Sequence, residues 1–216
     1  MSSILAGSAP RRATRRLLLA AGVLGGLSLS MIAAASAQAA TLTAATPCGT
    51  ATLTQPFLPF GDSGYYSLVA GGSFEGALTG WSLTGGAATV AGSEPYAATG
   101  SLGALSLALP AGASVQSPFM CVDGADTYFR FFALNKTAAS TLTVSVVYSI
   151  AGVPTAFPVG TVSGDSKWEP SAAMHTGGKI ASKLSSTGTA MMALRFTASG
   201  GTSQIDDVFL DPRLKH

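Results

Sequence analysis

The chain has 216 residues, of which 47% are hydrophobic, 10% are charged and 26 are glycines. This length suits one domain with a hydrophobic core of ordinary size. A chain with this many hydrophobic and this few charged residues is not expected to be intrinsically disordered.

The first residues are typical of a targeting segment rather than of a folded element. Several arginines, including the adjacent Arg15–Arg16, precede an apolar run at 17–35 that ends in small residues. This order predicts a secretory signal peptide over residues 1–39, with cleavage after Ala37 or after Ala39. Glycines and serines dilute the run, which makes a permanent membrane anchor the weaker alternative. General and twin-arginine export both remain open.

Cleavage of this segment changes the charge of the chain. It carries four of the 12 basic residues and none of the 10 acidic ones, so the mature chain keeps eight basic residues and a net charge of −2. No basic cluster remains that could neutralise several phosphates, which excludes nucleic acid as a partner. We expect a secreted, extracellular protein that is free of the membrane once the signal is removed.

The two cysteines, Cys48 and Cys121, both lie in the exported part, where thiols are oxidised. We expect a disulfide between them, which would stabilise the fold by roughly 4 kcal/mol on the chain-entropy model. Two separate buried thiols are the alternative. Cys48 belongs to a segment at 40–64 whose prolines, Pro56 and Pro59, exclude it from a central strand. This segment is predicted to be an extended arm that the disulfide fastens to the domain.

From residue 65 to residue 212 the chain consists of short alternating segments separated by glycine and proline turns. The segment 141–150 is the clearest, because the residues from Leu142 to Ile150 at every second position are apolar. Gly85–Gly86 predicts a tight hairpin between 81–84 and 88–91, and a short helical turn is expected within 179–186. The other expected strands are 65–69, 105–109, 114–122, 127–134, 157–162, 190–198 and 204–210. This pattern predicts an all-β fold, an antiparallel β-sandwich that is most simply a jelly roll.

Three pieces of this region resemble the carbohydrate-binding modules with a galactose-binding-like jelly roll that accompany bacterial xylanases and glucanases. They are Gly72–Glu75 with Trp81, which is similar to the family's Asn-x-x-Phe-Glu…Gly-Trp opening, Gly100–Ser101 before 105–107, and Ile205–Leu210, which is similar to its last strand. The resemblance spans residues 71–211. The arm and its Cys48 fall outside the pattern, and the asparagine usual at the opening is absent.

The resemblance implies a structural calcium ion where the first and last strands meet. Glu75 and Asp206 would be its carboxylate ligands, with backbone carbonyls completing the six to eight oxygens that calcium takes. Asp207 is the less favoured ligand, because neighbouring residues of a strand point to opposite faces. The alternative is that Glu75 caps a turn and the aspartates are solvated edge charges.

A sugar site needs exposed aromatic faces and planar polar groups beside them. The candidates are Tyr96 and Trp168 in loops, Tyr128 and Arg130 on the outward face of one strand, and Arg195 on another. They would bind a polysaccharide or a cell-surface glycan. Isolated surface aromatics are common, however, and Trp81 is expected in the core.

The sequence contains few residues that could be catalytic, and we expect no catalytic site. The mature chain has only His175 and His216, no nucleophile-elbow motif, too few ligands for zinc, and carboxylates scattered singly. Three hypotheses follow. The first is a secreted, non-catalytic carbohydrate-binding-like module. The second is an extracellular structural or protein-interaction domain on the same fold, and the third and weakest is a polysaccharide-active enzyme.

Overall fold

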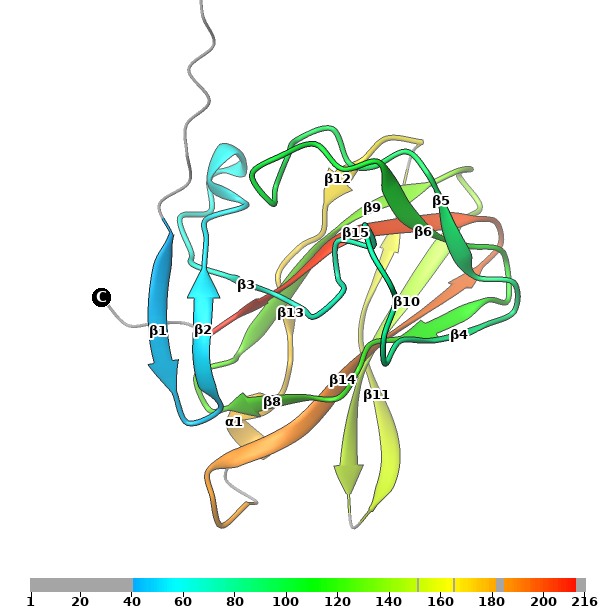
Figure 1. Cartoon of the computed structure of the whole chain (residues 1–216). Helices are drawn as coiled ribbons and strands as arrows, with labels where there is room; N and C mark the ends of the chain where they lie inside the picture. Colours follow the sequence, from blue (N-terminus) through cyan, green and yellow to red (C-terminus); the bar gives the residue numbers. More distant parts are fainter. Residues whose placement is uncertain (1–40, 151, 165, 182–184, 213–216) are drawn as a thin grey trace, which may run out of the picture. The chain divides into compact units, whose positions relative to one another are not determined.

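The computed structural model describes residues 41–150, 152–164, 166–181 and 185–212 (Figure 1). The predicted signal peptide at 1–39 lies outside the described residues. The described chain is an all-β sandwich in which the strand pairs are antiparallel, as the sequence predicts. Among these residues, no helix has the length and apolar character needed to cross a membrane.

The first layer is named here the β10 sheet. In spatial order its strands are β11 (Val153–Ser163), β10 (Thr141–Ile150), β14 (Thr189–Ser199), β7 (Ser114–Gln116) and β4 (Ser82–Thr84), with β8 (Met120–Asp123) also paired to β14. The long central pair β10–β14 runs from Thr141 opposite Ser199 to Tyr148 opposite Met192.

The second layer is named the β9 sheet. In spatial order it contains β12 (Glu169–Pro170), β9 (Tyr128–Asn135), β15 (Ser203–Asp211), β6 (Leu105–Leu109) and β5 (Ala88–Ala91), with β13 (Met174–His175) on β9 and β3 (Ser67–Leu68) on β15. The start of the domain pairs with its end in this sheet, because Leu68 lies opposite Phe209.

The core lies between the two sheets and follows the predicted alternation. Leu142, Val144 and Val146 of β10 are buried in it, and the rings of Phe131 and Phe196 meet edge to face across the layers at 4.9 Å. Trp81 is buried as predicted, and its indole N–H donates to the carbonyl of Ala70 (2.8 Å). Most hydrophobic stabilisation of the domain therefore comes from this interior.

Two predicted details are wrong. The glycine pair Gly85–Gly86 does not close a hairpin, because β4 pairs with β7 in one sheet and β5 pairs with β6 in the other. The glycines allow a crossover between layers: Gly85 has a φ of 68°, and a Cβ there would lie 2.6 Å from Ala113 Cα. The expected strand 114–122 is also divided into β7 and β8. Pro118 interrupts it, since proline has no N–H for a sheet hydrogen bond.

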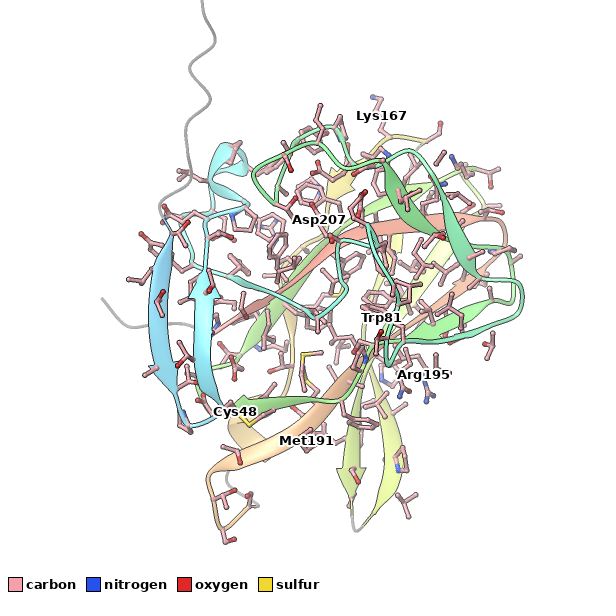
Figure 2. The ribbon with its side chains drawn as sticks, in the orientation of Figure 1. Cys48, Trp81, Lys167, Met191, Arg195 and Asp207 are labelled. Carbon is pink, nitrogen blue, oxygen red and sulfur yellow. A yellow bond between two sulfur atoms is a disulfide. The ribbon has the colours of Figure 1, made fainter. Side chains whose placement is uncertain are left out.

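The N-terminal arm differs from the extended segment that was expected. Its first part is a hairpin of β1 (Leu42–Thr46) and β2 (Gly49–Leu53), and a single 3-10 turn, η1 (Leu58–Phe60), follows. The predicted disulfide between Cys48 and Cys121 is confirmed, and it joins the turn of this hairpin to β8 (Figure 2). The short helix α1 (Gly178–Ala181) begins close to the segment where a helical turn was expected.

Candidate functional site

The outer face of the β9 sheet is covered by the chain's own N-terminal arm. The cover, called here the aromatic cap, consists of Phe57 and Phe60 of the arm, Tyr66 just after it and Tyr96 of the loop between β5 and β6, packed on Phe132 and Phe209. The ring centres of Phe57 and Phe132 lie 5.3 Å apart in a stacked arrangement, and both side chains are fully buried. The sandwich thus has a second, smaller core outside its main one.

Arg130, a predicted sugar ligand, is held within this cap. Its Nη1 donates to Asp62 Oδ2 (2.8 Å), its Nε donates to the Ser171 carbonyl (2.9 Å), and its guanidinium lies 4.2 Å from the Phe57 ring centre. These contacts engage the side chain on three sides. In this structure Arg130 ties the arm to β9 and is not presented to a ligand.

Tyr96 and Trp168, also predicted ligands, meet at the rim of the aromatic cap. The Tyr96 hydroxyl donates to the Trp168 carbonyl (2.8 Å), and its ring meets Phe60 edge to face at 4.8 Å. Tyr96 remains 42% exposed. Tyr128 lies apart from them, with its half-buried ring 4.2 Å from that of His175.

An acidic cluster lies beside β15, where the first and last strands meet. Asp206 Oδ2 accepts hydrogen bonds from Ser93 Oγ (2.6 Å) and from the N–H of Glu94 (3.0 Å). Glu75 Oε1 accepts from two consecutive backbone N–H groups, those of Ala104 and Leu105, at 2.8 Å each. Gly103 lies between Glu75 and Ser93, because a Cβ there would lie 2.4 Å from Glu75 Oε1 and 2.7 Å from Ser93 Oγ.

Glu94 belongs to this cluster, although the sequence interpretation set it aside as an isolated acid. It is 1% exposed, and its Oε1 and Oε2 accept from the N–H groups of Ala98 (2.8 Å) and Tyr96. Its loop is more than 100 residues from β15 in sequence, so only the fold brings Glu94 to Asp206. No local motif of the sequence signals this contact.

The strand alternation that disfavoured Asp207 does not apply at its position. The pairing of β15 with β9 is irregular between Asp206 and Phe209, and Asp207 has a φ of 45°.

Burial raises the pKa of Asp206 to about 6. Burial, the charges of Asp206 and Glu94 and a hydrogen bond to Glu94 raise the pKa of Asp207 to about 8. Within the described chain, no three His, Cys, Asp or Glu side chains are arranged as a metal-binding group.

The outer face of the β10 sheet, in contrast, is largely polar, with apolar residues at Pro158, Val147 and Ala193. Residues paired across antiparallel strands lie on the same face, and the register aligns hydroxyl and amide side chains in rows. One row is Thr161, Thr143, Thr197, Ser114 and Thr84; the next is Ser145, Arg195, Gln116 and Ser82; a shorter one is Ser163, Thr141 and Ser199. These three rows are called here the hydroxyl face. Their residues are exposed or half-buried.

Arg195, the remaining predicted ligand, is the one charged residue in these rows. Its Nε and Nη2 donate to Oε1 of Gln116 at 3.2 and 2.8 Å. Two further side chains are linked in the neighbouring row, where the hydroxyls of Ser114 and Thr197 lie 3.0 Å apart. Sequence alone could identify Arg195 as outward-facing, but not its alignment with Gln116, which lies 79 residues away.

Comparisons with known proteins give a likeness of fold only. No family model matches the chain, and no curated protein matches it in sequence. A Clostridium thermocellum xylanase 10B structure with CBM22-1 and GH10 modules, complexed with xylohexaose, has a TM-score of 0.47 and 17% identity over 67% of this chain. This chain covers 28% of that xylanase chain.

Isolated binding modules are similar as well. The family 11 carbohydrate-binding module of C. thermocellum has 16% identity and a TM-score of 0.42, covering 67% of this chain and 95% of that one. A xylan-binding CBM22 domain has 18% identity and a TM-score of 0.42, covering 69% and 96%. The similar solved structures are mostly carbohydrate-binding modules with a β-sandwich fold, which agrees with the resemblance seen in the sequence. At these values the likeness concerns strand arrangement and carries no argument about a ligand.

Proposed function

We propose that the chain is an exported, non-catalytic carbohydrate-binding-like module whose ligand surface is the hydroxyl face. The supporting observation is the alignment of neutral hydrogen-bonding side chains across five adjacent strands, with Arg195 as the only charge among them. The ligand that suits such a surface is a neutral polysaccharide, because its many hydroxyl groups need both donors and acceptors.

The chemistry of the rows supports this proposal. A serine or threonine hydroxyl can donate one hydrogen bond and accept others, so it can match a sugar hydroxyl in either orientation. Adjacent strands lie about 4.8 Å apart, which makes the row from Thr161 to Thr84 roughly 19 Å long. An extended oligosaccharide could contact all five strands. The hydrogen bonds to Gln116 fix the orientation of the Arg195 guanidinium. This reduces the side-chain entropy that is lost when a ligand binds Arg195.

Export is supported by the disulfide between Cys48 and Cys121, since such bonds persist in oxidising compartments. A non-catalytic role is supported by the way the acidic and imidazole side chains are used. Glu75 and Glu94 accept backbone hydrogen bonds, and the His175 ring packs at a tilt against Tyr128. Each is held by a structural contact.

We also propose that a calcium ion is bound by Glu75, Asp206 and Asp207; in the described chain these three are not arranged as a metal-binding group, so binding would have to draw their oxygens together. The donor chemistry fits, because these groups offer only oxygen, and Asp206, Glu94 and Glu75 all raise the pKa of Asp207 by their negative charge. A bound cation would neutralise these charges and hold the opening loop to the last strand. Ser93 holds Asp206 by a hydrogen bond of 2.6 Å, and two backbone N–H groups hold Glu75.

One observation favours a second function, an extracellular structural or protein-interaction domain. The aromatic and arginine side chains that a sugar site would use on the β9 sheet are packed under the arm. Arg130 contacts Phe57 and Asp62, and Trp168 packs against the aromatic cap. On this view the module keeps the sandwich and has lost a sugar site on that sheet.

Affinity electrophoresis of the oxidised mature chain in gels that contain neutral polysaccharides, such as xylan or mixed-linkage glucan, tests the proposal. We expect retarded migration, and at least 10-fold weaker retardation after Arg195→Ala or Gln116→Ala. Lys136→Ala, at an exposed position outside the hydroxyl face, is the control and should change nothing. Tyr96→Ala tests whether the rim of the aromatic cap contributes to polysaccharide binding. Equal retardation of Arg195→Ala and wild type would refute the hydroxyl face as the site, and no retardation in any polysaccharide would favour the second function.

A further inference from the structure

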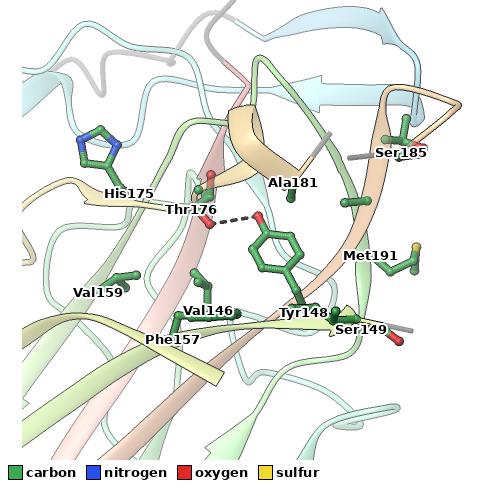
Figure 3. A pocket seen from close by; sticks show the side chains of 14 residues that line it. Val146, Tyr148, Ser149, Phe157, Val159, His175, Thr176, Ala181, Ser185 and Met191 are labelled. Carbon is green, nitrogen blue, oxygen red and sulfur yellow. Dashed lines mark hydrogen bonds between the residues drawn. The ribbon is translucent and has the colours of Figure 1, made fainter. Parts of the chain in front are cut away.

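A cavity of about 600 Å³ lies beneath the β10–β11 hairpin on the inward side of the β10 sheet (Figure 3). Its apolar wall includes Val146, Tyr148, Ile150, Phe157 and Met191. Its other lining residues come from β10, β11, β13, α1, the start of β14 and the segments between β13, α1 and β14. Among the described residues that line it, none carries a carboxylate, ammonium or guanidinium group. The cavity is separate from the hydroxyl face, because no residue of that face lines it.

The length of the hairpin explains why this apolar wall is not covered. β10 and β11 have 10 and 11 residues, and the pairing of β10 with β14 ends at Tyr148. The tip of the hairpin therefore extends past its neighbour. Ile150 and Phe157 stay 51% and 44% exposed, and Met191 on β14 stays 48% exposed. Large apolar side chains gathered around one hollow are costly to leave in water.

The inner end of the cavity has a fixed polar group. Tyr148 is 8% exposed, and its hydroxyl donates to the carbonyl of Thr176 (2.9 Å), the bond drawn in Figure 3. The phenol proton is thus engaged, while the phenol oxygen can still accept a hydrogen bond. Burial raises the pKa of Tyr148 to about 12, so the group is neutral at physiological pH. The His175 ring points away from Tyr148 in Figure 3 and packs at a tilt against Tyr128 instead.

We propose that this cavity binds a small, neutral and mainly apolar molecule of one to three rings, with one hydrogen-bond donor directed at Tyr148. The volume is within the range of roughly 300–1,000 Å³ that small-molecule sites have, and an apolar wall with one placed polar group is typical of them. An ionic ligand would lose its hydration without gaining a counter-charge from the described lining residues. A sugar would leave most of its hydroxyl groups without partners. This site therefore adds a second ligand class to the proposed polysaccharide module.

The test uses the neutral fluorescent amine N-phenyl-1-naphthylamine with the oxidised mature chain. We expect saturable fluorescence enhancement with one probe bound per chain. Phe157→Lys places a charge at the mouth of the cavity and should weaken probe binding at least 10-fold. Val153→Lys adds the same charge to the same strand at a 63% exposed position that does not line the cavity, and it should bind like the wild type.

A second variant and two controls make the outcome decisive. Ala190→Phe should fill the cavity without adding charge and should abolish binding, and the melting temperature of each variant verifies that it folds. Arg195→Ala should leave probe binding unchanged, whereas Phe157→Lys should leave polysaccharide retardation unchanged, which separates this site from the proposed function. The proposal is overturned by unsaturable binding, by equal affinities of Phe157→Lys and Val153→Lys, or by light scattering that shows a dimer excluding the probe.

Discussion

The guanidinium of Arg130 lies 4.2 Å from the centre of the Phe57 ring, and this contact joins the N-terminal arm to a central strand of the β9 sheet. The same guanidinium forms an ion pair with Asp62 at 2.8 Å, with the arginine side chain only 12% exposed. A cation over an aromatic face is stabilising, more so when water is excluded from the pair. The arm is thus an integral part of the folded body.

Replacing Phe57 with alanine should lower the free energy of unfolding by about 3 to 5 kcal/mol, the cost of removing a fully buried phenylalanine. Urea denaturation followed by tryptophan fluorescence measures this. Leu58→Ala is the matched control, because Leu58 is the next residue of the arm and is 48% exposed. Its effect should stay within about 0.5 kcal/mol. Similar small effects of both changes would mean that the arm does not pack as described.

The disulfide between Cys48 and Cys121 should make a separate contribution to stability. It joins residues 73 apart in sequence, and the chain-entropy model then assigns it about 4 kcal/mol through restriction of the unfolded chain. Urea denaturation with and without dithiothreitol should show this loss on reduction. A Cys48→Ser, Cys121→Ser double variant should match the reduced wild type and be insensitive to dithiothreitol. Unchanged stability of the reduced wild type would contradict the prediction.

The alternation of apolar and polar residues was sufficient to predict which side chains of a strand point into the core. A period of two places Leu142, Val144 and Val146 inward wherever one face of a strand is buried, and the structure confirms this. It could not show that the opposite face of β9 is also covered. One signal was available, since Phe132 is a large apolar residue on the supposedly solvated face and the arm contains Phe57. Only their pairing across the fold shows the aromatic cap.

Features that depend on distant pairings could not be predicted from one sequence. Gly85–Gly86 indicates a sharp change of chain direction, but a glycine pair does not specify whether the next strand returns to the same sheet. The hydroxyl face depends on the register between strands far apart in sequence, such as Thr143 opposite Thr197. Asp207 was misjudged for a related reason, because the irregular pairing in β15 breaks the alternation on which the interpretation relied.

Asp126 should make stability depend on pH. Its pKa rises from 3.8 to about 6 in the fold, first because of burial and then because of the negative charges of Asp123 and Asp211. An acid with a raised pKa binds its proton more tightly in the folded chain. Its contribution to stability is therefore complete below pH 3.8 and is lost as the pH rises to about 6, by on the order of 2 kcal/mol.

The substitution Asp126→Asn isolates this contribution, because asparagine keeps an oxygen for the Asp123 N–H that Asp126 accepts at 2.8 Å. Urea denaturation at a series of pH values measures the difference in unfolding free energy between the variant and the wild type. This difference should shift in favour of the variant between pH 4 and pH 6.5. The raised pKa values of Asp206 and Asp207 affect both proteins and cancel in the comparison. Parallel pH profiles would contradict the assignment to Asp126.

Calcium should raise the melting temperature if the acidic cluster binds it as proposed. At a concentration about 100 times its dissociation constant, a ligand of the folded state stabilises by about 2.7 kcal/mol, which is a rise of roughly 5 to 10 °C for a domain of this size. Asp206→Asn and Glu75→Gln should abolish the rise. Glu169→Gln, which neutralises an exposed carboxylate on β12, should retain it. Equal melting temperatures of the wild type in calcium and in excess chelator would leave the four acids as a cluster that is held by its own hydrogen bonds.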